Sequence, residues 1–148
     1  MLFDLEPRLT AYAGTLDDIS VPRTRTRLML RHSLHDKRFV ATENEHGVSG
    51  ADTVFHYWMD GSVITGTYHG GRIREGSLLG RAVDGDRIEL LYHCLTTEQE
   101  LLAGWSRGVV SADATGRLRL TFEWAWLTGD RDGGESSYVE LVDEAPQG

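Results

Sequence analysis

Residues 53–71 of the chain read TVFHYWMDGSVITGTYHGG, two runs of β-branched and aromatic residues that meet at Asp60-Gly61. Asp-Gly between alternating apolar segments is a strong hairpin signal, because a type I′ turn needs a positive φ at both central residues. Further turn signals recur at Gly70-Gly71, at residues 84–86 and at residues 112–116. This spacing leaves no room for crossover helices and predicts antiparallel neighbours as far as residue 127.

The same pattern continues on both sides of this hairpin. Strands are expected at residues 23–32, 37–43, 51–59, 62–69, 72–83, 87–95, 100–111, 117–127 and 136–142. A meander of this length must protect its edges, and closure into a barrel removes them. We therefore predict an all-β protein, an antiparallel up-and-down β-barrel of about eight to nine strands, wide enough for side chains or one small ligand.

The two ends of the chain differ from the barrel segment. Apolar residues at helical spacing predict a short helix over residues 5–16. Together with the strand at 23–32, this helix forms an N-terminal extension, residues 1–38, which packs on the barrel or caps it. The barrel domain is expected at residues 39–143, followed by a frayed tail at residues 144–148.

Composition limits the classes of function. The chain has 148 residues, of which 40% are hydrophobic and 26% charged, as in one ordinary globular domain. The formal net charge of −8 argues against nucleic-acid binding. No apolar run approaches the roughly 18–20 residues that span a bilayer, and residues 1–6 lack the features of a secretory signal. Because Cys94 is the single cysteine, we expect a cytoplasmic protein without disulfides, in which Cys94 packs as a small apolar residue.

An ordered set of motifs runs through residues 39–141. Its parts include TEN at 42–44, TVF at 53–55, GTYHGGRI at 66–73, GxLLG at 76–80, LYH at 91–93, GRLRL at 116–120 and EWxWxTGD at 123–130, where x is any residue. In these motifs the chain resembles small bacterial proteins commonly labelled N-acetylglutamate synthase. The resemblance implies a calycin-like barrel, similar in architecture to avidins, lipocalins and fatty-acid-binding proteins. Residues 1–38 are an addition to that pattern.

We do not expect acetyltransferase activity. Enzymes that use acetyl-CoA place the pyrophosphate on a Gly-rich loop at a helix N-terminus. Here the Gly-rich segment GGRIREG, residues 70–76, leads into an expected strand instead. If the protein is an enzyme, a cofactor-independent isomerase, cyclase or lyase fits better.

Alternation indicates which side chains face the barrel interior. Residues 88, 90, 92 and 94 of one strand, and residues 118, 120, 122, 124 and 126 of another, form the apolar or aromatic side of each strand. Aromatic rings offer a large contact area, and tyrosine adds a polar group. The predicted ligand-binding wall consists of Tyr68, Tyr92, Trp105, Trp124 and Trp126. An ordinary aromatic core without a cavity is the alternative.

Arg107 is a further candidate for ligand binding. It alternates with Leu101, Ala103 and Trp105 on what reads as an apolar face. An inward arginine must pair with a carboxylate of a neighbour or a ligand, because an unpaired buried charge is costly. An arginine near the barrel rim would instead reach solvent.

Three residues are candidates for acid–base catalysis. His56 and His69 lie on either side of the first hairpin, and either could transfer protons near neutral pH. Glu123, next to Trp124, could act as a general acid if it turned inward, although its alternation with the aromatic residues favours the outer face. The six histidines show no metal-binding spacing, so neither a metal nor a cofactor is expected.

Two functions therefore compete on the sequence alone. The first is a binding module that holds an apolar or aromatic small molecule against the tryptophans. The second is a cofactor-independent enzyme, an isomerase, cyclase or lyase such as those of secondary metabolism, that positions its substrate inside the barrel. A filled barrel that acts through its surface, as a homodimer, is a third possibility.

Overall fold

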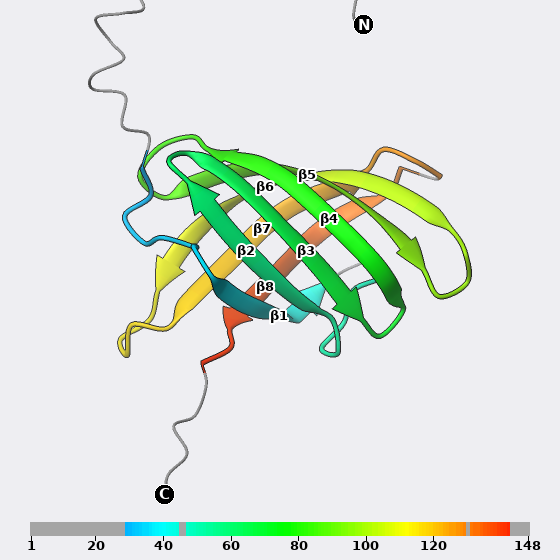
Figure 1. Ribbon diagram of the computed structural model, residues 1–148, viewed down its shortest axis with the longest axis horizontal. Helices are drawn as coiled ribbons and strands as arrows, with labels where there is room; N and C mark the ends of the chain where they lie inside the picture. Colours follow the sequence, from blue (N-terminus) through cyan, green and yellow to red (C-terminus); the bar gives the residue numbers. More distant parts are fainter. Residues whose placement is uncertain (1–28, 45–46, 130, 143–148) are drawn as a thin grey trace, which may run out of the picture.

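The computed structural model describes residues 29–44, 47–129 and 131–142. Eight strands, each paired antiparallel with the next, close into one barrel because the first strand also pairs with the last (Figure 1). They are β1 (Lys37–Asn44), β2 (Val54–Asp60), β3 (Val63–Gly70), β4 (Ile73–Ala82), β5 (Arg87–Thr96), β6 (Leu101–Ala112), β7 (Leu118–Trp126) and β8 (Gly133–Glu140). The predicted all-β, up-and-down barrel is confirmed. No helix in the described segments is long and apolar enough to cross a membrane.

The turns form where the sequence predicts them, although not all in the predicted conformation. The β2–β3 loop consists of Gly61 and Ser62, since Asp60 pairs with Val63, and only Gly61 has a positive φ, of 63°. The turn is therefore not the type I′ turn centred on Asp60-Gly61 that was expected. Asp84 stabilises the β4–β5 turn, because its carboxylate accepts hydrogen bonds from the backbone N–H groups of Asp86 and Arg87.

Residues 29–36, the strap, precede β1 and cover one end of the barrel. Leu30 and Leu34 belong to the buried core, and Leu34 has no exposed surface. The backbone N–H of Arg31 donates to the carbonyl of Gly85 (2.7 Å), and that of Asp36 donates to the carbonyl of Tyr57 (2.8 Å). The strap is thereby tied to β2 and to the β4–β5 turn.

The strap corrects one prediction. A strand was expected at residues 23–32, but residues 29–32 do not form one. The physical reason is that β1 pairs with both β2 and β8, so the barrel has no free edge for a ninth strand. The predicted helix at residues 5–16, the rest of that strand and the tail at 144–148 lie outside the described residues.

The barrel is filled at the strap end. Five fully buried side chains pack there, namely Leu34, Phe39, Ile64, Ile88 and Leu120. They come from the strap and from four different strands, so this half of the interior is a continuous apolar core. Any hollow in the molecule must lie toward the other end.

Candidate functional site

A cavity opens at the end of the barrel opposite the strap. Its volume is about 50 Å³, taken as the space available to the centre of a water-sized sphere. Since one water needs about 10–15 Å³ on this measure, the enclosed part accommodates a small chemical group. Its lining comes from all eight strands and the β1–β2 loop: Asn44, Gly47, Val48, Ser49, Phe55, Tyr57, Tyr68, Ile73, Leu78, Leu90, Tyr92, Cys94, Ser106, Phe122, Trp124, Trp126, Ser136 and Tyr138.

Two tryptophans of β7 form the most aromatic part of the wall. Trp124 is buried and Trp126 half-buried, with ring centroids 5.1 Å apart and the planes nearly perpendicular. Trp126 also meets Tyr92 of β5 edge to face at 6.0 Å. Such edge-to-face pairs are favourable ring arrangements that hold the wall in shape. The two indoles therefore lie where alternation along 117–127 predicted them.

A second aromatic group is formed by rings of β2, β3, β7 and β8. Phe55 stacks on Tyr68 at 4.6 Å, and Tyr138 contacts Phe55 and Phe122 edge to face at 5.1 and 5.7 Å. The Tyr68 hydroxyl donates a hydrogen bond to the backbone carbonyl of His93 (2.9 Å). These contacts fix the rings, so the cavity is preformed.

Glycines on neighbouring strands make room for the rings. Gly76 of β4 pairs with Tyr68, Gly104 of β6 pairs with Tyr92, and a β-carbon on either glycine would lie within 3 Å of the tyrosine ring. Each ring therefore lies across the neighbouring strand, over the position of the missing side chain. The glycines set the width of the cavity by deciding where the aromatic side chains can lie.

Polar groups gather at the mouth, near the β1–β2 loop. The Asn44 amide donates to the backbone carbonyl and the hydroxyl of Ser49, at 2.9 and 2.7 Å. Ser136 and Tyr138 of β8 face the same space. This end of the cavity can exchange hydrogen bonds with a ligand, whereas the aromatic wall provides apolar contact.

One donor inside the wall has no partner. Among the described residues, the indole nitrogen Nε1 of Trp124 is the buried side-chain polar atom for which no hydrogen bond is formed. A buried donor left unpaired costs about 1–3 kcal/mol. A bound group that accepts a hydrogen bond from this N–H would remove that cost.

The cavity lining is electrically neutral. It contains no Asp, Glu, Lys, Arg or His side chain. Burial raises the pKa of Tyr57, Tyr68, Tyr92 and Tyr138 above the ordinary value of 10.0. Burial also raises the pKa of the Cys94 thiol, although a hydrogen bond with Tyr68 partly opposes the shift. The ionisable groups that face the cavity are therefore uncharged at neutral pH.

Trp105 of the predicted wall and the further candidate Arg107 lie on the outer face of the barrel, which corrects the sequence interpretation. The inner side of β6 carries small or apolar residues such as Gly104, Ser106 and Val110, and the alternate residues Trp105 and Arg107 point outward. The Arg107 guanidinium lies 4.9 Å from the centre of the Trp105 ring. Arg107 does share a face with Leu101, Ala103 and Trp105, but this face is the outer one, because the inner side of β6 consists largely of small residues.

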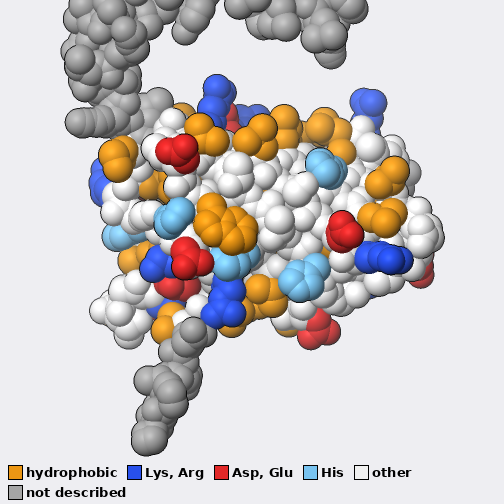
Figure 2. All heavy atoms as spheres, in the orientation of Figure 1, with side chains coloured by type: hydrophobic (Ala, Val, Ile, Leu, Met, Phe, Trp, Pro, Cys, Tyr) orange, Lys and Arg blue, Asp and Glu red, His pale blue; other side chains and the backbone are white. Residues whose placement is uncertain are grey.

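The three candidate catalytic residues also lie on the outer surface. Glu123 is exposed between the inward-facing Phe122 and Trp124, and His69 is exposed next to the inward-facing Tyr68. The register places His69 opposite Val54 and His56 opposite Thr67, so the two histidines are not a directly opposed pair. Histidine side chains are spread over the outer face shown in Figure 2.

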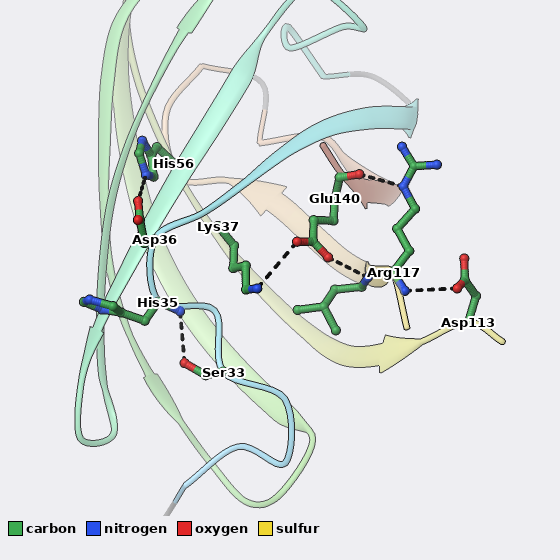
Figure 3. Close-up of polar contacts among 9 residues, drawn as sticks. Ser33, His35, Asp36, Lys37, His56, Asp113, Arg117 and Glu140 are labelled. Carbon is green, nitrogen blue, oxygen red and sulfur yellow. Dashed lines mark hydrogen bonds and ion pairs between the residues drawn. The ribbon is translucent and has the colours of Figure 1, made fainter. Parts of the chain in front are cut away.

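His56 takes part in a contact with the strap. Its Nε2 lies 2.8 Å from a carboxylate oxygen of Asp36 (Figure 3). The His56 ring also stacks on Trp58 at 4.0 Å. The His56 bond lowers the pKa of the exposed Asp36 carboxyl. In the same view, Lys37 and Glu140 join the first and last strands at 3.6 Å. Within the described residues, no group of three His, Cys, Asp or Glu side chains could hold a metal ion.

Several lining residues were missed from the sequence. Ser136 and Tyr138 alternate in β8, a signal that the neighbouring glycines and the short strand obscured. Asn44 and Ser49 were assigned to a polar loop, and only the barrel geometry turns that loop toward the mouth. Loop residues of this kind have no periodicity from which their direction could be predicted.

The chain matches a known protein family. A family model described as "Avidin-like protein" matches residues 32–141, a range that includes all eight strands. No curated protein matches the chain.

Proposed function

The chain belongs to the avidin-like protein family, and on this basis we propose that it binds a small, uncharged molecule in the cavity of its barrel. The ligand has an apolar or aromatic part and at least one hydrogen-bonding group. The family membership supports small-molecule binding in general. The residues around the cavity support the narrower chemical class.

The observation that carries this proposal is the neutral, aromatic lining. A charged ligand would lose its hydration on entry, and no lining residue offers an opposite charge. Rings from β2, β3, β5, β7 and β8 surround the space and provide contact on several sides. An uncharged molecule therefore loses the least hydration on entry and gains contact with the rings on several sides.

The unpaired Trp124 N–H and the polar mouth define where hydrogen bonds form. An acceptor on the ligand, such as a carbonyl oxygen, satisfies Nε1 of Trp124. The amide and hydroxyl of Asn44 and Ser49 bond with the ligand's polar end. Trp126, which is half-buried, covers the portion of the ligand that extends beyond the enclosed space.

The enzymatic alternative has less support. His56, His69 and Glu123 lie on the outer surface, and the lining residues that can exchange protons are tyrosines and one cysteine with raised pKa values. A general acid or base works best with a pKa near the operating pH. The residues around the cavity therefore support binding more strongly than catalysis.

Native mass spectrometry of the full chain, purified from its own source, tests for a bound molecule. We expect a complex of defined added mass that is released on unfolding and rebinds to the refolded protein. The released compound should carry no net charge at pH 7. A released compound that is strongly ionised would contradict the proposal.

A matched series of fragments tests the preference for neutral ligands directly. Benzamide, benzoate and benzamidine share one ring and carry a neutral, a negative and a positive group. We expect benzamide to bind at least tenfold more tightly than either charged relative, as measured by ligand-observed NMR titration. Equal binding of benzoate or benzamidine would show that the neutral lining does not decide selectivity.

Trp126→Ala tests the position of the site. We expect benzamide binding to be lost while the circular dichroism spectrum is retained, because Trp126 is only half-buried and its loss leaves the core intact. Trp58→Ala is the matched control, since Trp58 is a half-buried tryptophan on the outer face of β2. If both variants, or neither, lose the fragment, the cavity is not the binding site.

A further inference from the structure

The outer face of β4, β5 and β6 carries an exposed apolar row. Leu79, Leu91 and Trp105 are direct cross-strand neighbours in the register. Leu79 is 59% and Leu91 58% exposed, while Trp105 is half-buried. A row of hydrophobic side chains runs along the upper edge of the molecule in Figure 2, where β4 and β5 lie in Figure 1. Contiguous exposed apolar surface on a sheet is typical of an interaction site.

A row of charges runs beside the apolar row. Arg81, Glu89, Arg107 and Glu123 are direct cross-strand neighbours on β4, β5, β6 and β7, so the signs alternate as plus, minus, plus, minus. The first two form an ion pair at 2.9 Å, and Arg107 lies over the Trp105 ring. Arg81, Glu89 and Arg107 line a shallow groove on the outer surface together with the apolar row.

The order of these charges is self-complementary. Read from the other end, the row becomes minus, plus, minus, plus, which is opposite in sign to the original at every position. A surface that binds a second copy of itself about a two-fold axis must have this property, whereas a surface for an unrelated partner need not. The centre of the pattern lies between Glu89 on β5 and Arg107 on β6.

We propose that this face, the β4–β7 face (Leu79, Arg81, Glu89, Leu91, Trp105, Arg107 and Glu123), packs against the same face of a second copy of the chain. The two-fold axis runs along the strands, between β5 and β6. It places Glu89 opposite the partner's Arg107, and Arg81 opposite the partner's Glu123. It also places Leu91 against the partner's Trp105.

In this dimer the apolar row provides buried contact and the charged row provides specificity. Sheets that pack face to face interdigitate their side chains, which buries the leucines and Trp105. Tryptophan and arginine are the residue types that dominate binding energy when they are buried at the centre of an interface. The flanking charges then select the partner and its register, since like charges would meet in any arrangement displaced by one strand.

Sedimentation equilibrium of the full chain tests the dimer. We expect the wild type to be a dimer, and Glu89→Arg and Arg107→Glu each to raise the dimer dissociation constant at least tenfold. Each single reversal brings two pairs of like charges together across the axis. Glu75→Arg is the matched control, because Glu75 is an exposed residue of β4 outside the two rows, and it should leave the dissociation constant unchanged.

Mixing the two single variants tests the symmetry itself. In a heterodimer of Glu89→Arg with Arg107→Glu, every facing pair is again of opposite sign, so we expect dimers to return in an equimolar mixture. The double variant should dimerise on its own for the same reason, although its charges no longer alternate within one chain. A monomeric wild type, variants that dimerise as wild type does, or a mixture that stays monomeric would each overturn the proposal.

Leu91→Ser tests the apolar row separately. It should raise the dissociation constant at least tenfold, and no second charge variant should rescue it. Leu101→Ser is the matched control, since Leu101 is 75% exposed at the start of β6 and lies outside the two rows. A dimer that Leu91→Ser does not weaken would contradict a contact between this row and its copy.

Discussion

Single residues on β6 and β7 show how far alternation can be trusted. Trp124 and Trp126 face inward as predicted, because Arg119, Thr121 and Glu123 make the other side of β7 charged or polar along most of the strand. Trp105 faces outward, because the inner side of β6 consists largely of small residues beneath the rings of Tyr92 and Phe122. Hydrophobicity alone could not reveal this, since the space is filled by side chains from other strands.

Cys94 offers a chemical measure of how enclosed the cavity is. The thiol faces the cavity, is 2% exposed, and has a raised pKa because it is buried. We expect iodoacetamide at pH 8 to react with it at least about tenfold more slowly than with the unfolded chain, because the thiolate is the reactive form. Labelling followed by mass spectrometry measures the rate, and reaction as fast as in urea would mean that the cavity opens readily.

Among the elements, the paired strands were predicted well, whereas the strap was not. The eight strands follow from turn signals and alternation, and all of their ends lie within three residues of the predicted ones. The structure of residues 29–36 does not follow from any local pattern. Leu30 and Leu34 are buried because the open end of a barrel must be covered, which is a tertiary requirement.

Glycines on neighbouring strands control the width of the cavity, because aromatic rings lie over them. Gly104→Val places a branched side chain where the Tyr92 ring lies. We expect a loss of stability of about 1–3 kcal/mol from overpacking, and at least a tenfold loss of benzamide affinity as the ring is displaced. Gly50→Val is the control, because nothing lies within 4 Å of a β-carbon there. Urea denaturation and NMR titration measure the two effects, and unchanged binding would mean that Tyr92 does not shape the site.

The strap should contribute measurably to stability. Leu34→Ala removes a fully buried side chain at the filled end, and truncations of this kind cost about 2–5 kcal/mol. Met29→Ala, at a residue 59% exposed, should change the free energy of unfolding by less than about 0.5 kcal/mol. Urea denaturation of both variants provides the comparison. Equal stability of the two variants would show that the strap does not complete the core.

At the scale of the whole molecule, closure of the barrel was predictable, because a long antiparallel meander must protect its edge strands and closure removes them. The partial filling of the barrel was not predictable in the same way. Whether an eight-stranded barrel is hollow depends on how particular side chains lean across the interior, and one half here is packed solid by Phe39, Ile64 and their neighbours. The other half stays open because rings there rest on glycines and on one another.

The buried tyrosines predict that the protein loses stability in alkali. Burial holds the pKa values of Tyr57, Tyr68, Tyr92 and Tyr138 above 10.0, the value expected in the unfolded chain. The free energy of unfolding should therefore be unaffected by tyrosine below pH 10 and fall as the pH rises above it. The slope is at most about 1.4 kcal/mol per pH unit for each tyrosine. Urea denaturation at pH 8 to 11 measures it, together with tyrosinate absorbance. Ionisation near pH 10 in the folded protein would contradict the prediction.

The pairing of β1 with β8 has a consequence for how the protein is made. Phe39 lies opposite Glu140, so the seam of the barrel joins the beginning and the end of the meander. A chain still emerging from the ribosome without its last strand has two unpaired edges and no enclosed space. Folding must wait for these distant segments to meet, which slows it. During synthesis, the growing polypeptide is therefore both exposed to aggregation and unable to retain a ligand until its final strand is released.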